Sequence, residues 1–223
     1  MDEQGSGISI GAILIGWTEL LRRHASLAGL AFGALAAIGT LSDVALGERG
    51  GQIGGSIATF FVQYLVAEHL LRAEGLMDDS LSGRRYGSVF GASFLTTLGA
   101  FAGVVLLVLP GFYVLARWSL TVPIIIAEGL GATAAMGESW RRTGPSVWPI
   151  FAIFLTALVG VVALGAAVGV IAGIAAAGQP AGLLVSALTN SLGAGFSVLG
   201  TMLTIALYAL LGHSRRPYDD IFA

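Results

Sequence analysis

The sequence predicts an all-α fold, a polytopic membrane helical bundle in which six transmembrane helices form three hairpin repeats behind an N-terminal amphipathic helix. Hydrophobic residues make up 56% of the 223 residues and charged residues only 11%, and the mean hydropathy is +0.86. Soluble domains carry about one quarter charged residues. Because no polar stretch is long enough to form a second folded unit, we expect a single membrane domain over residues 1–223.

The first predicted element is an interfacial amphipathic helix over residues 8–23. Arg22 and Arg23 occupy its last turn. Such a helix lies flat at the membrane surface, with its apolar side toward the acyl chains and its arginines near anionic head groups. The apolar side consists of Ile10, Ile13, Leu14, Trp17, Leu20 and Leu21.

Six apolar segments have about the 20 residues that a helix needs to cross a bilayer core roughly 30 Å thick. One helix running through Pro110 would cover about 40 residues and about 60 Å, twice that thickness. We therefore expect a tight hairpin at this point, because Pro110 lacks an N–H and Gly111 accepts positive φ. The predicted spans are residues 25–46, 53–71, 88–109, 111–128, 147–176 and 183–211.

The connections between these spans divide the arginines unevenly between the two sides of the membrane. Nine arginines lie in the connections on one side of the membrane, and only Arg49 lies in those on the other side. Since positively charged flanks are retained in the cytoplasm, both ends of the chain are expected there. The nine arginines on the cytoplasmic side are Arg22, Arg23, Arg72, Arg84, Arg85, Arg141, Arg142, Arg215 and Arg216.

An internal repeat accompanies the arginine pairs. Residues 82–87 (SGRRYG) recur as 139–144 (SWRRTG), and 19–23 (ELLRR) resembles 138–142 (ESWRR). We infer three units, each a cytoplasmic lead-in that ends in Arg-Arg and is followed by a helical hairpin. Glycines four residues apart let helices approach closely, and an exposed Gly173 would favour a homo-oligomer.

Arg117 is the one arginine predicted inside a span, roughly 10 Å along its helix from the Pro110 turn. A charge at membrane depth costs about 2.5 kcal/mol or more, so the guanidinium needs a partner. Asp43, Gln63 and Asn190 are candidates, and with Arg117 they form a possible intramembrane polar site. Arg117 either binds an anionic group such as a lipid phosphate, or an ion, or it is a structural residue that pairs internally or snorkels toward the head groups.

Two interfacial acidic residues, Glu68 and Glu128, lie at the cytoplasmic ends of their spans. A proton relay is one interpretation. Pairing with the nearby Arg72, Arg141 or Arg142 is the preferred one, since interfacial glutamates commonly form such pairs. The predicted cytoplasmic basic rim consists of the arginine pairs Arg22, Arg23, Arg84, Arg85, Arg141 and Arg142.

Several classes of function are excluded or disfavoured. The chain has no cysteine, and its three histidines lie far apart in sequence, which disfavours a metal site. An intramembrane protease would need a base or a second aspartate deep in the bundle, and the spans offer neither. With a net charge of −2 and no basic stripe, nucleic acid is an improbable partner. We therefore expect no catalytic residues and no cofactor.

A pattern of proline, glycine and polar positions at fixed spacing is similar to the membrane domain of glycerophosphoryl diester phosphodiesterases. It also resembles the stand-alone bacterial relatives of that domain, which are six-helix inner-membrane proteins. The similarity is strongest over residues 105–150. The residues that carry it are Leu109-Pro110-Gly111, Arg117, Pro123, Glu128-Gly129, Ala135, Ser139 and Trp148.

The resemblance implies a module linked to envelope or lipid handling in the bacterial inner membrane. Family members with a soluble phosphodiesterase domain cleave glycerophosphodiesters, but the chain ends at Ala223, so we expect no catalytic barrel of about 250 residues. The expected function is non-enzymatic association with membrane lipids or membrane-protein partners. The alternative is a small transporter or channel that uses the region of Pro110, Arg117 and Pro123.

Overall fold

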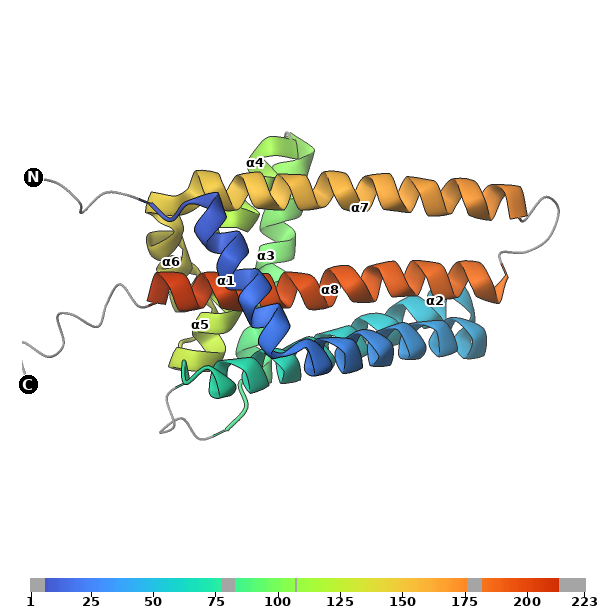
Figure 1. Ribbon diagram of the computed structural model, residues 1–223, viewed down its shortest axis with the longest axis horizontal. Helices are drawn as coiled ribbons and strands as arrows, with labels where there is room; N and C mark the ends of the chain where they lie inside the picture. The colour runs from blue at the N-terminus through green and yellow to red at the C-terminus, as the bar shows by residue number, and fades with distance from the viewer. Residues whose placement is uncertain (1–6, 78–82, 107, 176–181, 213–223) are drawn as a thin grey trace, which may run out of the picture. The chain divides into compact units, whose positions relative to one another are not determined.

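A computed structural model describes residues 7–77, 83–106, 108–175 and 182–212. The described residues form helices and their connections, and they contain no strand (Figure 1). Four stretches among them are long and apolar enough to cross a membrane: Ala25–Gly47, Leu109–Glu128, Ala132–Ile171 and Leu183–Gly212. The chain is therefore an all-helical membrane protein, as its composition predicts.

The helices divide into two compact units. Unit 1 comprises Met1–Leu20, Ala67–Leu155 and Met202–Ala223, and unit 2 comprises Leu21–Val66 and Thr156–Thr201. The elements in chain order are α1 (Ile10–Arg23), α2 (Ala25–Ala73), α3 (Tyr86–Leu106), α4 (Val108–Arg117), α5 (Thr121–Glu128), α6 (Ala132–Thr143), the 3₁₀ turn η1 (Gly144–Ser146), α7 (Val147–Ala175) and α8 (Leu183–Gly212).

In unit 2, α2 is a helical hairpin that reverses at Gly47. The backbone of Gly47 has φ 70° and ψ 173°, a conformation that residues with a side chain rarely adopt. The two arms approach closely where both carry glycine, since a Cβ built on Gly55 would lie 4.0 Å from the Cα of Gly39. This hairpin matches the first two predicted spans, 25–46 and 53–71.

In unit 1, the helices from α3 to α6 pack against one another. Helix α3 packs against α4, α5 and α6, and α5 packs against α6. The core of this unit is aliphatic, because the helix faces that meet inside it carry leucine and isoleucine. Fully buried side chains include Ile13, Leu70, Leu71, Leu120, Ile124, Ile125, Ile150, Met202, Ile205 and Leu207.

The structure corrects the prediction for residues 109–128. The predicted span 111–128 is not one helix, because α4 ends at Arg117 and α5 begins at Thr121. Pro123 explains the interruption: it has no N–H to bond the carbonyl four residues earlier, and its ring clashes with that carbonyl in a continuous helix. In the first turn of α5, where such N–H groups have no partner in any case, the proline is tolerated.

The predicted hairpin is present, since α3 packs against α4, but its predicted turn at Pro110-Gly111 is wrong. Both residues lie in the first turns of α4, and Gly111 is not among the glycines with positive φ. Residue 107, where α3 gives way to α4, lies outside the described residues. The last two predicted spans correspond to α7 and α8, with the 178–180 turn also outside the described part.

The Arg-Arg lead-ins are not alike. Arg22-Arg23 ends α1 and Arg141-Arg142 lies in the last turn of α6, whereas Arg84 and Arg85 precede α3 outside any helix. The first and third lead-ins are therefore amphipathic helices joined to a long apolar helix. On α1, Ile13 and Leu20 are buried and Ile10, Leu14 and Ile15 are exposed. Its interfacial position stays a prediction.

Candidate functional site

The break between α4 and α5 is closed by hydroxyl groups of α6. The Ser139 hydroxyl donates to the Arg117 carbonyl at 2.8 Å and accepts the Leu120 N–H at 3.1 Å. The Thr143 hydroxyl lies 3.1 Å from the same carbonyl and 2.8 Å from the carbonyl of Ser139. Ser139 and Thr143 have no exposed surface. Interrupted backbone in a membrane needs such internal partners, since lipid offers none.

The side chain of Arg117 extends over the ring of Trp140. Its guanidinium carbon lies 4.3 Å from the centre of that ring and 6.0 Å from the centre of the Tyr113 ring. A guanidinium above an aromatic face is attracted by the ring quadrupole. The Arg117 Nε is buried, and neither a hydrogen-bond acceptor nor a carboxylate partner for this guanidinium is found among the described residues.

Glycine at position 144 makes room for this guanidinium. A Cβ built on Gly144 would lie 3.0 Å from Nη1 of Arg117. The neighbouring Thr121 hydroxyl is buried and, among the described residues, also has no hydrogen-bond partner. The two residues that bound the break between α4 and α5 therefore each carry a buried polar atom, Arg117 Nε and Thr121 Oγ1, that has no hydrogen-bond partner among the described residues.

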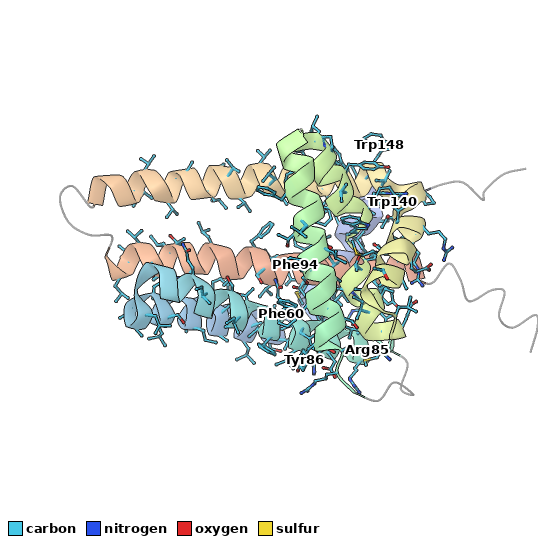
Figure 2. All side chains as sticks on the ribbon, turned by 180° about the vertical axis from the view of Figure 1, so that it is seen from behind. Phe60, Arg85, Tyr86, Phe94, Trp140 and Trp148 are labelled. Carbon is cyan, nitrogen blue, oxygen red and sulfur yellow. The ribbon has the colours of Figure 1, made fainter. Side chains whose placement is uncertain are left out.

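Several aromatic rings lie near Arg117 in unit 1, and two of them, Trp140 and Trp148, are labelled in Figure 2. The Tyr113 ring centre lies 6.1 Å from that of Trp140 and 6.3 Å from that of Trp148, and Trp148 is 69% exposed. The ring centre of Trp118 lies 6.3 Å from that of Trp140. Exposed tryptophan and tyrosine rings are typical of the membrane–water interface, where one edge meets apolar chains and the other meets polar groups.

A second polar group ties α5, α6 and α8 together within unit 1. Arg142 Nη1 and Nη2 bond the two oxygens of Glu128 at 2.5 and 2.8 Å, and its Nε bonds Glu138 at 2.5 Å. The Tyr208 hydroxyl donates to Glu128 at 2.9 Å. The Arg142 side chain is only 6% exposed. The expected pairing of Glu128 with Arg142 is confirmed, but Arg142 is enclosed and does not belong to an open basic rim.

Glu68 at the end of α2 also pairs as expected. It bonds Arg72 at 3.1 Å and Arg84 at 3.2 Å, and both arginine side chains are more than half exposed. The hydrogen bond from Arg84 to Glu68 raises the pKa of Arg84 above its ordinary value. Of the other residues of the predicted basic rim, Arg22, Arg23 and Arg141 are exposed. The ion pairs of Glu68 with Arg72 and Arg84 are solvated. They connect the end of α2 to the residues before α3 and contribute little to stability.

The other predicted site residues lie in unit 2. Asp43 accepts hydrogen bonds from Ser186 at 2.6 Å and from Asn190 at 2.7 Å, so the structure brings Asp43 and Asn190 together. Gln63 donates to Ser197 at 2.5 Å. These contacts hold the arms of α2 to α8. Arg117 belongs to unit 1, and its contacts are those given above, so a joint site of all four residues stays a prediction.

Comparison with known families supports the resemblance seen in the sequence. Residues 90–212 match the family described as the membrane domain of glycerophosphoryl diester phosphodiesterase. The chain belongs to this membrane-domain family. No curated protein and no solved structure matches the chain. Within the matched region of this membrane domain, Arg117 and Ser139 meet at the helix break, and Glu128 binds Arg142.

Sequence reasoning missed the residues that complete both groups. Trp140, Tyr113 and Gly144 surround Arg117 from three different elements, and no spacing rule links positions on α4, α6 and η1. Tyr208 reaches Glu128 across 80 residues. The signal that could have located the break is Pro123, read as the first turn of a new helix. The residues that carry the family resemblance therefore lie at the break between α4 and α5 and in the helices around it.

Proposed function

We propose that this membrane domain is a non-enzymatic module of the bacterial inner membrane that associates with anionic lipids, holding a phosphate group at Arg117. One observation carries the proposal: Arg117 lies on an aromatic platform without a carboxylate partner among the described residues, while Arg72, Arg84, Arg141 and Arg142 all have one. A partly buried guanidinium without a carboxylate partner favours an anion, and phosphate matches its planar fork.

The aromatic neighbours support a ligand that belongs to the membrane. Tyr113, Trp140 and Trp148 are residue types enriched at head-group depth, and Trp148 is largely exposed. A glycerophospholipid would place its acyl chains beside such rings and its phosphate near Arg117. The Thr121 hydroxyl, buried and without a partner in the described chain, is a second donor for a phosphate oxygen. Both ends of the chain lie in the cytoplasm in this proposal.

The test is a lipid titration of the purified full chain in detergent, with thermal unfolding as the readout. Phosphatidylglycerol should raise the Tm of the wild type and of Arg72→Gln, whose arginine is exposed and already paired, by several degrees more than phosphatidylcholine does. Arg117→Gln should lose that difference, and Trp140→Leu should reduce it. Inorganic phosphate in a parallel titration separates a lipid head group from a free anion.

An equal response of Arg117→Gln and the wild type to phosphatidylglycerol would overturn the proposal. Gly144→Ala provides a second, milder variant, because its methyl group would displace the Arg117 guanidinium while keeping its charge. We expect this variant to need a several-fold higher phosphatidylglycerol concentration for half of the Tm shift. A stabilisation by inorganic phosphate that matches that by phosphatidylglycerol would replace the lipid by a soluble anion.

The second candidate is a small transporter or channel, which the interrupted helix at Arg117 favours. Transporters place ion and substrate sites at discontinuous helices. Here, however, the backbone groups at the break, Arg117 C=O and Leu120 N–H, are both hydrogen-bonded to the Ser139 hydroxyl and so are not available to a substrate. Leu120 is also fully buried. Flux of anions into liposomes that contain the wild type, but not Arg117→Gln, would favour transport over the lipid-binding module.

A further inference from the structure

The contacts of α4 place it beside the cytoplasmic arginine pair of α6. The Arg117 carbonyl lies within hydrogen-bond distance of Ser139 and Thr143, the residues around Arg141 and Arg142 in the last turn of α6. Tyr113, one turn earlier in α4, lies 6.3 Å from Trp148 at the start of α7. All of these residues belong to unit 1. Helix α4 is therefore level with the junction where the chain leaves α6 and enters α7.

The length of α4 limits how far the chain can reach from this level. The helix has 10 residues, Val108–Arg117, and so extends about 15 Å at 1.5 Å per residue. The hydrocarbon core is about 30 Å thick. If Arg141 and Arg142 lie at the cytoplasmic surface, the start of α4 reaches the middle of the membrane at most. The start of α4 at Val108 then cannot lie on the opposite surface.

Arginine pairs flank the segment from α3 to α6, which by the positive-inside rule puts both of its ends on the cytoplasmic side. Arg84, two residues before α3, bonds Glu68 near the end of α2, and Arg141 and Arg142 lie in the last turn of α6. The segment that follows α3 packs along the body of that helix. A Cβ on Gly91 would contact Ala132 at the start of α6 at 3.9 Å, and a Cβ on Gly99 would overlap the ring of Trp118. The segment therefore leaves the cytoplasmic side and returns to it.

We propose that α3 and α4 form a re-entrant hairpin that inserts into the cytoplasmic leaflet and does not cross the membrane. The crossings are then made by the two arms of α2, by α7 and by α8, an even number that keeps both ends in the cytoplasm. The partner of this surface is the acyl region of one leaflet. The proposal does not depend on what Arg117 binds.

The side chains of α3 fit this partner. Exposed apolar residues recur in α3 from Phe90 to Phe101, which is expected where lipid and not protein covers the surface. Helix α3 alone, with 21 residues, is long enough to cross, so it is the short α4 and its contacts with α6 that decide between crossing and re-entry. The exposed residues along the hairpin are Phe90, Phe94, Leu98, Phe101 and Leu109, with Phe94 labelled in Figure 2.

Cysteine labelling tests this topology directly, because the chain contains no cysteine of its own. Three single variants of the full chain are needed: Leu109→Cys near the hairpin tip, Gln52→Cys after the Gly47 reversal, and Gly137→Cys on an exposed position of α6. Intact cells are treated with a membrane-impermeant maleimide, and a second sample is treated after solubilisation in detergent. Reaction in detergent shows that each thiol is accessible in the folded protein.

We expect Gln52→Cys to react from outside, and Leu109→Cys and Gly137→Cys to react at least 10-fold more slowly until detergent is added. Reaction of Leu109→Cys from outside at the rate of Gln52→Cys would overturn the proposal, as would reaction of Gly137→Cys. A nitroxide attached at Leu109 gives a second measurement. Greater collision with oxygen than with a nickel chelate is expected at this depth, and quenching by chelate added only outside would contradict re-entry.

Discussion

The carboxylate of Glu128 receives both terminal nitrogens of Arg142 at 2.5 and 2.8 Å, and this pair joins the end of α5 to the last turn of α6. It is nearly closed to solvent at the arginine, which is 6% exposed, and Glu138 and Tyr208 supply the remaining bonds. A buried charge that loses its partner costs far more than an exposed one, because the remaining charges stay desolvated.

Arg142→Met should therefore be strongly destabilising. Removing the arginine leaves Glu128 with the Tyr208 hydroxyl but no cationic partner among the described residues, while Glu138 keeps Arg141, and losses of about 3–5 kcal/mol are typical of broken buried pairs. Arg72→Met is the matched control, since Arg72 also bonds a glutamate but is 53% exposed, and should cost about 1 kcal/mol or less. Thermal unfolding in detergent measures both. Similar Tm values for the two variants would contradict the enclosed network.

Ser139→Ala should weaken the junction of α4 and α5. The variant leaves the Arg117 carbonyl with the Thr143 hydroxyl alone and the Leu120 N–H without a partner, at a cost of about 1–3 kcal/mol for a buried unsatisfied group. The control is Thr97→Ala, whose exposed hydroxyl bonds a carbonyl within α3 and should change the free energy of unfolding by less than about 0.5 kcal/mol. Equal effects would show that the serine does not support the break.

Gly39→Ala should disrupt the packing of α2 against α8 in unit 2. A Cβ at this position would overlap the Asn190 side chain, which is held by hydrogen bonds to Asp43 and Ser186. Overpacking of this kind costs about 1–3 kcal/mol. Gly33→Ala lies on the same arm with no atom within 4 Å and should be neutral or stabilising, because alanine favours helix. A stabilising Gly39→Ala would mean that the two helices do not approach there.

Gly99→Ala should loosen the α3–α4 hairpin. The new methyl group would overlap the rigid ring of Trp118, whose Cη2 would lie 2.9 Å from that methyl carbon, so α3 must shift. We expect a loss of about 1–3 kcal/mol and a change in tryptophan fluorescence. Gly91→Ala, also inside α3, meets only Ala132 at 3.9 Å and should leave both measurements unchanged. If both variants have wild-type fluorescence, the contact between Gly99 and Trp118 is absent.

The sequence predicts the long helices well because their signal is local. The bounds of α7 and α8 follow from runs of apolar residues, and the reversal at Gly47 lies where the first two predicted spans meet. The pairing of Glu128 with Arg142 was also predictable, since opposite charges at one interface have few other partners. These features depend on residues near one another in sequence or on a single physical preference.

The break after Arg117 was not predicted, because hydropathy measures how apolar a segment is and not whether its helix is continuous. Residues 111–128 are apolar enough for one span, and the partners that stabilise two short helices lie about 20 residues away or more, on α6. The same is true of the platform formed by Trp140. The depth of Arg117 was predicted by counting residues from Pro110 along one helix. Such a count contains no information on the contact between α4 and the end of α6 that carries the arginine pair.

The hydroxyl groups that close the break also set an order for biogenesis. During synthesis, α4 and α5 leave the ribosome before Ser139 and Thr143 do, so the Arg117 carbonyl and the Leu120 N–H have no α6 partner while the first helices enter the membrane. The segment completes its native bonding only after α6 has been made. These backbone groups therefore cannot be paired as in the folded protein until residue 143 has been translated, and a chain truncated before α6 would leave both of them without these partners.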